Sequence, residues 1–191
     1  MKNLAVILII FYSLYSVNSN AQEEQTFYPN WYGSFHLAQA DTSLNSGGQD
    51  FNYFNVGGAV GYRFSEYLST EFFMSFATND KRDDLVSDFI GENVGTRFDA
   101  VGVYLVAQTQ GEFYAKGRVG LTQSRFTYSV SGFEDESKGS VGLSYGIGVG
   151  TKVENYTFDL EYIVMPEADD PLFSADSYDT DIIAVSMSID F

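Results

Sequence analysis

Apolar and polar residues alternate along eight segments of the chain. In the clearest of them, residues 141–153, one set of positions holds Val, Leu, Tyr, Ile, Val, Thr and Val, while the positions between them hold Gly, Ser or Lys. A period of two residues indicates a β-strand with two different faces. The eight segments cover residues 31–38, 54–64, 68–76, 98–108, 113–128, 141–153, 158–164 and 183–191. We therefore predict an all-β fold of eight antiparallel strands.

The orientation of one segment stays open at this point. In residues 98–108, Val101, Val103 and Leu105 compete with Phe98 and Tyr104 for the apolar face. Because both alternating sets contain large apolar residues, the pattern does not decide which set faces which side.

The connections between these segments alternate in length. Short turns are predicted at residues 65–67, 109–112 and 154–155. Long polar loops are predicted at residues 40–52, 77–96, 129–140 and 166–181. Short turns at one end and long loops at the other are typical of an up-and-down barrel. We predict an eight-stranded antiparallel up-and-down transmembrane β-barrel with short periplasmic turns and four long extracellular loops.

The composition of the less apolar face indicates which side meets lipid. That face consists mostly of Gly, Ser and Ala with a few charges. The outside of a water-soluble, lipocalin-like carrier would instead hold many charged and amide side chains. Small residues suit the narrow interior of an eight-stranded barrel. We therefore predict that the apolar face meets lipid, and a periplasmic lipocalin-like carrier is the less favoured alternative.

Aromatic residues gather near the short-turn ends of the predicted strands. A band of this kind is typical of the interface between a membrane and water. The residues that we expect in this girdle are Phe64, Tyr67, Phe113, Tyr114, Tyr156, Phe158 and Phe191.

The first 21 residues have the pattern of a secretory signal peptide. Lys2 precedes a short apolar run, and Ser19 and Ala21 are small residues at the −3 and −1 positions of a cleavage site. The run, about twelve residues long, is too short to span a hydrocarbon core of about 30 Å. We expect residues 1–21 to be a cleaved Sec signal peptide, residues 22–30 a periplasmic lead, and residues 31–191 the barrel.

Composition removes several classes of function. The chain carries 10 basic and 26 acidic residues, a formal net charge of −16. Such an excess of acid argues against nucleic acid or an anionic membrane surface as a partner held by charge. The absence of Cys excludes disulfides, thiolate metal sites and a cysteine nucleophile, and the single His disfavours a His-rich metal site. We expect no cofactor.

Several short segments resemble the small OmpA/OmpX-type outer-membrane β-barrel family. They are Gly-Tyr-Arg-Phe at 61–64, Glu-Tyr-Leu-Ser-Thr-Glu at 66–71, Tyr-Ala-Lys-Gly-Arg-Val-Gly at 114–120 and the terminal Ile-Asp-Phe at 189–191. The resemblance extends over about residues 27–191. It implies a Gram-negative outer membrane, periplasmic termini, surface loops, outer-membrane lipid and lipopolysaccharide as surroundings, and an assembly machinery that reads Phe191.

Charged residues on the predicted lumen face are candidates for a structural network. They are Arg63, Glu71, Lys116, Arg118, Lys152, Asp159, Glu161 and Asp190. An unpaired charge inside a low-dielectric barrel costs several kcal/mol, so each needs a partner. We suggest Arg63 with Glu71 and Lys152 with Asp159 as such pairs, and predict a plugged lumen, with a narrow ion path as the alternative.

His36 is the one residue that invites an enzymatic interpretation. Outer-membrane enzymes that modify lipid pair a His with a Ser and a carboxylate. Ser34 lies on the same face but two residues away along the strand. We place His36 by parity in the lumen near the extracellular end, hydrogen-bonded to its neighbours, and predict no catalytic residue.

The predicted loops carry most of the acid. Carboxylate clusters suit Ca²⁺ or Mg²⁺, which could bridge the loops to lipopolysaccharide, but a solvated acidic surface is the favoured interpretation. Phe126, Phe133 and Phe173 are candidate contacts for a surface ligand. The acidic residues are Asp80, Asp83, Asp84, Asp88, Glu92, Glu134, Asp135, Glu136, Glu167, Asp169, Asp170, Asp176, Asp179 and Asp181.

These observations favour a non-enzymatic outer-membrane barrel with a plugged lumen. Its acidic surface loops would then serve envelope integrity, adhesion or surface recognition. A narrow, porin-like channel is the first alternative, and a lipid-modifying enzyme or a lipocalin-like carrier is less favoured.

Overall fold

The computed structural model describes residues 30–44, 50–82, 87, 94–130, 135–169 and 177–191. Nearly all of them belong to β-strands. The eight long strands are β1 (Asn30–Leu44), β2 (Phe51–Arg63), β3 (Leu68–Ala77), β5 (Val94–Gln108), β6 (Phe113–Val130), β7 (Glu136–Val153), β8 (Tyr156–Val164) and β10 (Ser177–Asp190). Two short strands, β4 (Lys81–Arg82) and β9 (Ala168–Asp169), pair with β5 and β10.

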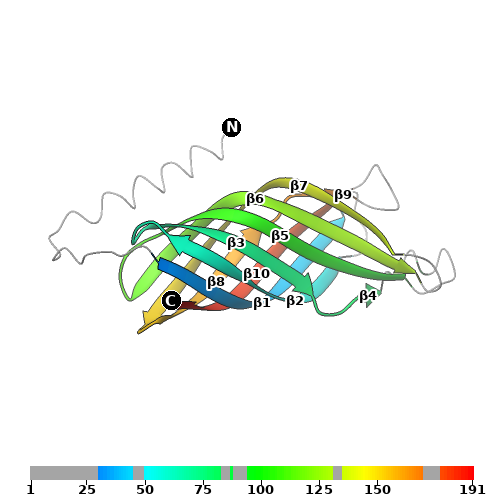
Figure 1. Ribbon diagram of the computed structural model, residues 1–191. Helices are drawn as coiled ribbons and strands as arrows, with labels where there is room; N and C mark the ends of the chain where they lie inside the picture. Colours follow the sequence, from blue (N-terminus) through cyan, green and yellow to red (C-terminus); the bar gives the residue numbers. More distant parts are fainter. Residues whose placement is uncertain (1–29, 45–49, 83–86, 88–93, 131–134, 170–176) are drawn as a thin grey trace.

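The long strands close into an antiparallel barrel (Figure 1). Each pairs with its neighbour in the chain, and β1 also pairs with β10, with Tyr32 opposite Asp190 and Leu44 opposite Tyr178. Closure leaves no long strand with a free edge, so every one of them can satisfy its backbone hydrogen bonds within the sheet, as a membrane requires. The predicted eight-stranded antiparallel barrel is confirmed.

The two ends of the barrel differ. At one end, here called the short-turn end, β2 joins β3 after Arg63, β5 joins β6 after Gln108, and β7 joins β8 through Glu154 and Asn155. Glu154 adopts a left-handed conformation with φ of 56°, which allows this two-residue turn. The opposite end, the long-loop end, carries β4 and β9. The three predicted short turns are thus confirmed.

The strands extend further into the predicted long loops than the sequence indicated. β1 continues to Leu44 and β2 begins at Phe51, so most of the expected first loop is strand. At this level Asp41 lies opposite Asp181, and the hydroxyls of Thr42 and Thr180 are 3.0 Å apart. The predicted loop limits at residues 40, 140 and 181 were therefore wrong. Where polar residues occupy both faces of a strand, no alternation of apolar and polar residues marks it.

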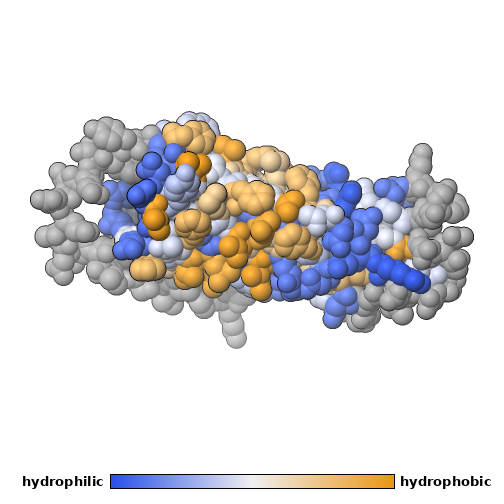
Figure 2. Space-filling model, turned by 90° about the horizontal axis from the view of Figure 1, so that it is seen from below, coloured by the Kyte–Doolittle hydropathy of each residue, from blue (hydrophilic) through white to orange (hydrophobic). Residues whose placement is uncertain are grey.

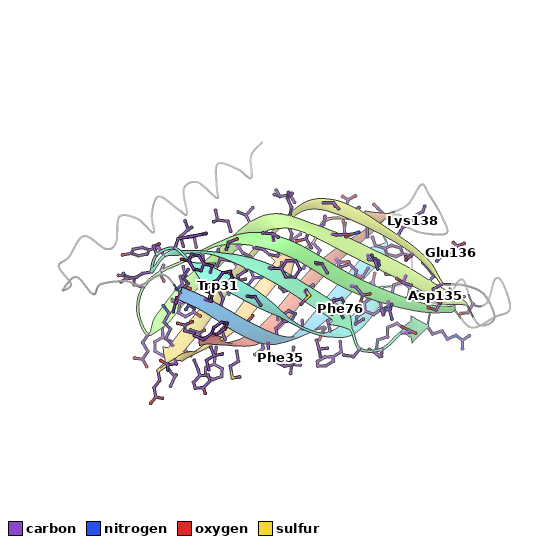
Figure 3. The ribbon with its side chains drawn as sticks, in the orientation of Figure 1. Trp31, Phe35, Phe76, Asp135, Glu136 and Lys138 are labelled. Carbon is purple, nitrogen blue, oxygen red and sulfur yellow. The ribbon has the colours of Figure 1, made fainter. Side chains whose placement is uncertain are left out.

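Apolar side chains cover the outside of the barrel. Trp31, Phe35 and Phe76 are 53%, 52% and 43% exposed and point away from the lumen (Figure 3). In the space-filling view, hydrophobic residues form a band across the middle, with hydrophilic residues on either side (Figure 2). Because a water-soluble carrier would place this face inward, the lipocalin-like alternative is wrong. In the described part of the chain, no helix is long and apolar enough to cross a membrane.

The orientation of β5 is now decided. Phe98 and Tyr104 are fully buried in the lumen, while Val103 and Leu105 are 54% and 48% exposed on the outside. Tyr114, which we expected in the aromatic girdle, also points inward and is 5% exposed. Its neighbour in the chain, Phe113, is 77% exposed on the outside. Consecutive residues of a strand point to opposite faces, so an assignment that is off by one residue places a side chain on the wrong face.

Candidate functional site

Five charged residues meet inside the barrel, and we call them the lumen network. They are Glu71 from β3, Lys116 and Arg118 from β6, and Asp159 and Glu161 from β8. The three strands are not neighbours, since β5 lies between β3 and β6, and β7 lies between β6 and β8. The network therefore crosses the lumen instead of running along one wall.

Lys116 and Arg118 join the carboxylates of two strands. The Lys116 ammonium lies 3.1 Å from Glu161, 3.4 Å from Asp159 and 3.5 Å from Glu71. The Arg118 guanidinium is 3.0 Å from Glu71 and 2.7 Å from Glu161. All five side chains are nearly inaccessible to solvent. Interactions between buried charges are weakly screened, so this arrangement fixes β3, β6 and β8 relative to one another.

Glycines of β7 allow β6 and β8 to reach each other. In the pairing register, Gly148 lies between Lys116 and Glu161, and Gly150 lies between Tyr114 and Asp159. A Cβ added at Gly148 would lie 2.7 Å from both the Glu161 side chain and a backbone oxygen. These glycines therefore pack the lumen, as was expected of the small residues on the inward face.

At the short-turn end, the charges pair differently from our suggestion. Arg63 forms an ion pair with Asp190, on the far side of β1, and its guanidinium lies 4.4 Å from the centre of the Tyr32 ring. Tyr32 donates a hydrogen bond of 2.6 Å to Glu71. The suggested pair of Arg63 with Glu71 was therefore wrong, because Tyr32 lies between the two residues.

Lys152 also differs from the expectation. Its ammonium lies 5.2 Å from the centre of the Tyr114 ring, and Tyr114 donates a hydrogen bond to Asp159. Tyr114 thus takes the place of Lys152 beside Asp159, and the suggested direct ion pair is wrong. The sequence did not indicate this, since it gave Tyr114 an outward position.

His36 lies in the middle of the barrel rather than near the long-loop end. His36 lies six residues after the start of β1, and its neighbours across the sheet are Gly57 and Ser186. The imidazole stacks on Phe73 with ring centres 4.8 Å apart, and Nε2 is buried without a hydrogen-bond partner among the described residues. The predicted hydrogen bonding of His36 is thus missing at Nε2, because the adjacent wall is Gly57 and an aromatic ring.

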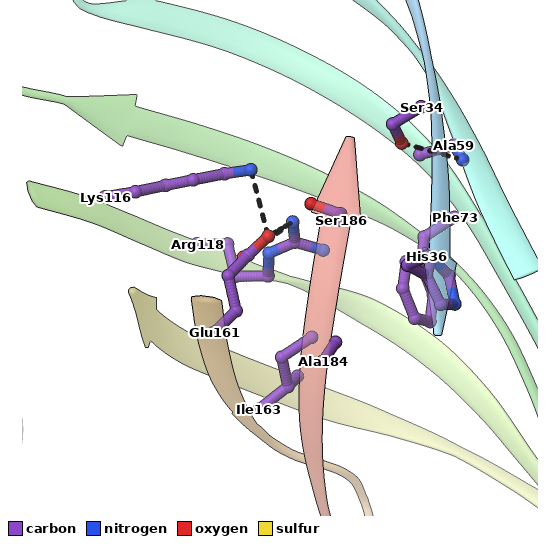
Figure 4. Close-up of a pocket in the computed structure, with 10 residues that line it drawn as sticks. All are labelled: Ser34, His36, Ala59, Phe73, Lys116, Arg118, Glu161, Ile163, Ala184 and Ser186. Carbon is purple, nitrogen blue, oxygen red and sulfur yellow. Dashed lines mark hydrogen bonds and ion pairs between the residues drawn. The ribbon is translucent and has the colours of Figure 1, made fainter. Parts of the chain in front are cut away.

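A small cavity borders His36 and the lumen network (Figure 4). Its volume of about 10 Å³ has room for about one water molecule. Ser34 accepts a hydrogen bond from the backbone of Ala59, and no hydrogen bond joins it to His36 Nε2. The cavity therefore offers neither a substrate pocket nor a paired serine and histidine.

Residues 142–146 read Gly-Leu-Ser-Tyr-Gly, the spacing of a hydrolase nucleophile. In hydrolases this Ser occupies a sharp turn between a strand and a helix. Here Ser144 lies within β7, fully buried, and its hydroxyl donates to the carbonyl of Val164 and lies 2.8 Å from the Tyr104 hydroxyl. The motif therefore packs the lumen.

Aromatic side chains fill the lumen towards the long-loop end, and we call them the aromatic cluster. Phe126 stacks on Tyr178 with ring centres 4.2 Å apart, and the hydroxyls of Tyr128 and Tyr178 are 2.6 Å apart. Phe126 was expected as an exposed ligand contact, which is wrong, since it is completely buried. Phe133 and Phe173 lie outside the described residues. The cluster consists of Phe51, Tyr53, Phe98, Phe126, Tyr128 and Tyr178.

Residues 165–168 fold into the mouth of the barrel above Tyr104. The Met165 backbone donates to Thr180, and its sulfur accepts a hydrogen bond of 3.9 Å from the Tyr104 hydroxyl. Ala168 is fully buried and pairs with Tyr178. This segment therefore packs beside the aromatic cluster on the long-loop side of the lumen.

The acidic residues that the structure describes at the long-loop end do not form a cation site. Asp135 and Glu136 are exposed at the start of β7 (Figure 3), and Asp179 and Asp181 lie in β10. Among the described residues, no group of three or more His, Cys, Asp or Glu is arranged to hold a metal ion. The expected carboxylates at 83, 84, 88, 92, 134, 170 and 176 lie outside the described residues.

Comparison with known proteins agrees with this architecture. Neisserial surface protein A superposes with a TM-score of 0.67 at 16% identity, covering 86% of this chain and 100% of that one. Ail of Yersinia pestis gives a TM-score of 0.62 at 14% identity over 86% and 100%, and OprG of Pseudomonas aeruginosa gives 0.53 at 12% over 85% and 96%. At these identities the likeness concerns the fold alone.

Sequence comparison identifies the family. No curated protein matches the chain. The family model described as the outer membrane protein beta-barrel domain matches residues 7–191. The match covers all eight strands of the barrel. The chain therefore belongs to the outer membrane protein β-barrel domain family, whose members are located in the bacterial outer membrane.

Proposed function

We propose that this protein is a non-enzymatic outer-membrane barrel that does not conduct solutes and presents its long-loop end at the cell surface, for envelope integrity, adhesion or surface recognition. The observation that supports the proposal is that two sets of side chains pack inside the lumen at different heights. The lumen network spans the lumen from β3 to β8, and the aromatic cluster fills it towards the other end. A solute would have to displace both.

Opening the lumen would cost free energy both at the lumen network and at the aromatic cluster, which are the two levels of closure. Removing one partner from a buried ion pair typically costs about 3–5 kcal/mol, so charges of the lumen network do not separate freely. The aromatic cluster excludes water by direct packing, with three of its rings buried without any exposed surface. A narrow channel would require both levels to rearrange together.

Conductance across planar lipid bilayers tests closure. We expect the wild-type protein and each single variant, Arg118→Ala and Phe126→Ala, to remain closed, because one level still blocks the lumen. The double variant should show transient conductance, and this result would demonstrate that the assay detects opening of the lumen. Glu136→Gln, at the exposed start of β7, is the matched control. Stable, large single-channel conductance of the wild type would contradict the proposal and favour the channel.

The surface role is supported by the position of acidic residues at the long-loop end. Asp135 and Glu136 are exposed there, as are Asp41 and Asp179. Ail, which shares the fold, is an attachment invasion locus protein. Acidic exposed residues favour a neutral or cationic partner over a polyanion.

Labelling of intact cells tests the proposed orientation. The chain has no Cys, so a single introduced thiol reports its own location. We expect Asp135→Cys to react with a membrane-impermeant maleimide on intact cells, and Asn155→Cys, in the turn between β7 and β8, to react only after lysis. Labelling of Asn155→Cys alone on intact cells would contradict the proposed display.

A further inference from the structure

Arg118 carries buried N–H groups that the lumen network does not use. In the described part of the chain, all its contacts with carboxylates run through one terminal nitrogen, Nη2, which lies 3.0 Å from Glu71 and 2.7 Å from Glu161. The other terminal nitrogen, Nη1, and Nε are buried and have no hydrogen-bond partner among the described residues. A guanidinium has two N–H groups on Nη1 and one on Nε, so three donors remain open. Buried donors of this kind are normally satisfied by protein or by ordered water.

The aromatic rings beside Arg118 do not supply the missing acceptor. Its guanidinium carbon lies 5.0 Å from the centre of the Tyr104 ring and 5.6 Å from the centre of the Phe73 ring. A ring face attracts the cation as a whole, but it offers no oxygen lone pair to the individual N–H groups. A buried donor that is left unpaired costs its full desolvation penalty. An acceptor is therefore needed next to the guanidinium.

The cavity beside Arg118 has the size and the polar lining for one water molecule (Figure 4). Its volume is about 10 Å³, and a water molecule in such a space needs roughly two to four polar partners. Ser34 lines it from β1 and accepts a hydrogen bond from the backbone of Ala59, so its own hydroxyl can still donate. Ser186 lines it from β10 and donates a long hydrogen bond of 3.4 Å to Asp159, so its oxygen can still accept. Together with Arg118, these two hydroxyls supply the partners that a water molecule needs.

We propose that this cavity binds one internal water molecule, which accepts a hydrogen bond from Nη1 of Arg118 and is shared with the hydroxyls of Ser34 and Ser186. The ion pairs of the lumen network join β3, β6 and β8. The water extends these links to β1 and β10, the two strands whose pairing closes the barrel. Arg118 thus connects the lumen network to the closing seam, in addition to pairing with the carboxylates. This water site lies inside the barrel and does not depend on what the long-loop end binds.

Magnetic relaxation dispersion of ¹⁷O in water tests the proposal on the refolded full-length protein in detergent micelles. The method counts the water molecules that stay inside the protein while it tumbles. Ala184 lines the cavity, so Ala184→Val places two additional methyl groups where the water lies. We expect this variant to hold one internal water molecule fewer than the wild type. Ala38→Val, at a buried position of β1 that does not line the cavity, is the matched control and should leave the count unchanged.

Ser186→Ala tests the polar contact separately, without filling the cavity. Loss of one hydrogen bond should shorten the residence time of the water about fivefold, as obtained from the temperature dependence of the dispersion. Ser188→Ala is the matched control, because Ser188 is also buried on the inward face of β10 but does not line the cavity. Folding of every variant is checked by its migration in SDS before heating. If Ala184→Val does not fold, the two serine variants decide.

Equal numbers of internal water molecules in the wild type and in Ala184→Val would overturn the proposal. So would the loss of one water molecule in Ala38→Val as well, since the count would then not report on this cavity. An unchanged residence time in Ser186→Ala would remove this serine from the site and overturn the link to β10.

Discussion

Individual glycines of β7 determine how closely the charged side chains of β6 and β8 approach. Gly148 and Gly150 leave space that Lys116, Tyr114 and the two carboxylates of β8 occupy. The alternation of small and large residues predicted this inward face correctly. It could not predict which charges would meet, because the pairs depend on register and on Tyr114, which the sequence placed outside.

Replacing Gly148 with Ala should destabilise the barrel. The added Cβ would approach a backbone oxygen at 2.7 Å, so the wall itself must shift, which typically costs about 1–3 kcal/mol. Gly117→Ala is the matched control, since the nearest atom to its added Cβ lies 4.0 Å away. Urea unfolding in lipid vesicles measures both, and equal stability of the two variants would contradict this packing.

Replacing Arg118 with Met should lower the free energy of unfolding more than Gly148→Ala does. Glu71 and Glu161 would lose a partner within 3.0 Å, and an uncompensated buried charge costs about 3–5 kcal/mol. The free energy of unfolding from urea titration is the readout. If the network holds, adding Glu71→Gln to Arg118→Met should recover part of the loss, and a strictly additive double variant would show that the two residues are not coupled.

Among the elements, the strands were predicted better than their ends. Apolar alternation identified all eight, yet β1, β7 and β10 extend into segments such as residues 41–43, where polar residues occupy both faces. The aromatic cluster was also missed, although Phe98, Phe126 and Tyr128 lie within segments that were predicted as strands. Phe51 and Tyr53, and likewise Phe126 and Tyr128, are two residues apart and share a face, which was the available signal.

The aromatic cluster should contribute strongly to stability. Phe126→Ala removes a completely buried ring that stacks on Tyr178, and such a change typically costs about 3–5 kcal/mol. Leu121→Ala, on the lipid-facing side of the same strand, should cost less because lipid fills the space. Thermal unfolding followed by gel migration compares the two, and a larger loss for Leu121→Ala would contradict the proposed role of the cluster.

At the scale of the whole molecule, the family resemblance supplied what the pattern alone could not, namely the membrane in which the barrel resides. The role of Phe191 as the assembly signal stays a prediction. In the structure this residue is 74% exposed, and its backbone donates to the carbonyl of Trp31, so the side chain contributes little to the barrel itself.

Phe191→Ala should therefore lower the amount of folded protein in the outer membrane without changing the stability of refolded protein. The ring faces outward beyond the last residue of β10, where an assembly factor has access to it. Quantifying the folded band in membrane fractions and the urea midpoint in vitro separates the two effects. A lowered midpoint with normal membrane yield would show that the residue acts through stability instead.

We expect this closed β-barrel to be embedded in the lipid of the outer membrane. Gel migration of isolated outer-membrane fractions in SDS, with and without boiling, tests it most directly. A folded barrel resists SDS because its backbone hydrogen bonds are closed on themselves. We expect a band in the outer-membrane fraction that migrates differently until it is heated. A protein found soluble in the periplasm, with identical migration before and after boiling, would contradict a barrel embedded in the membrane.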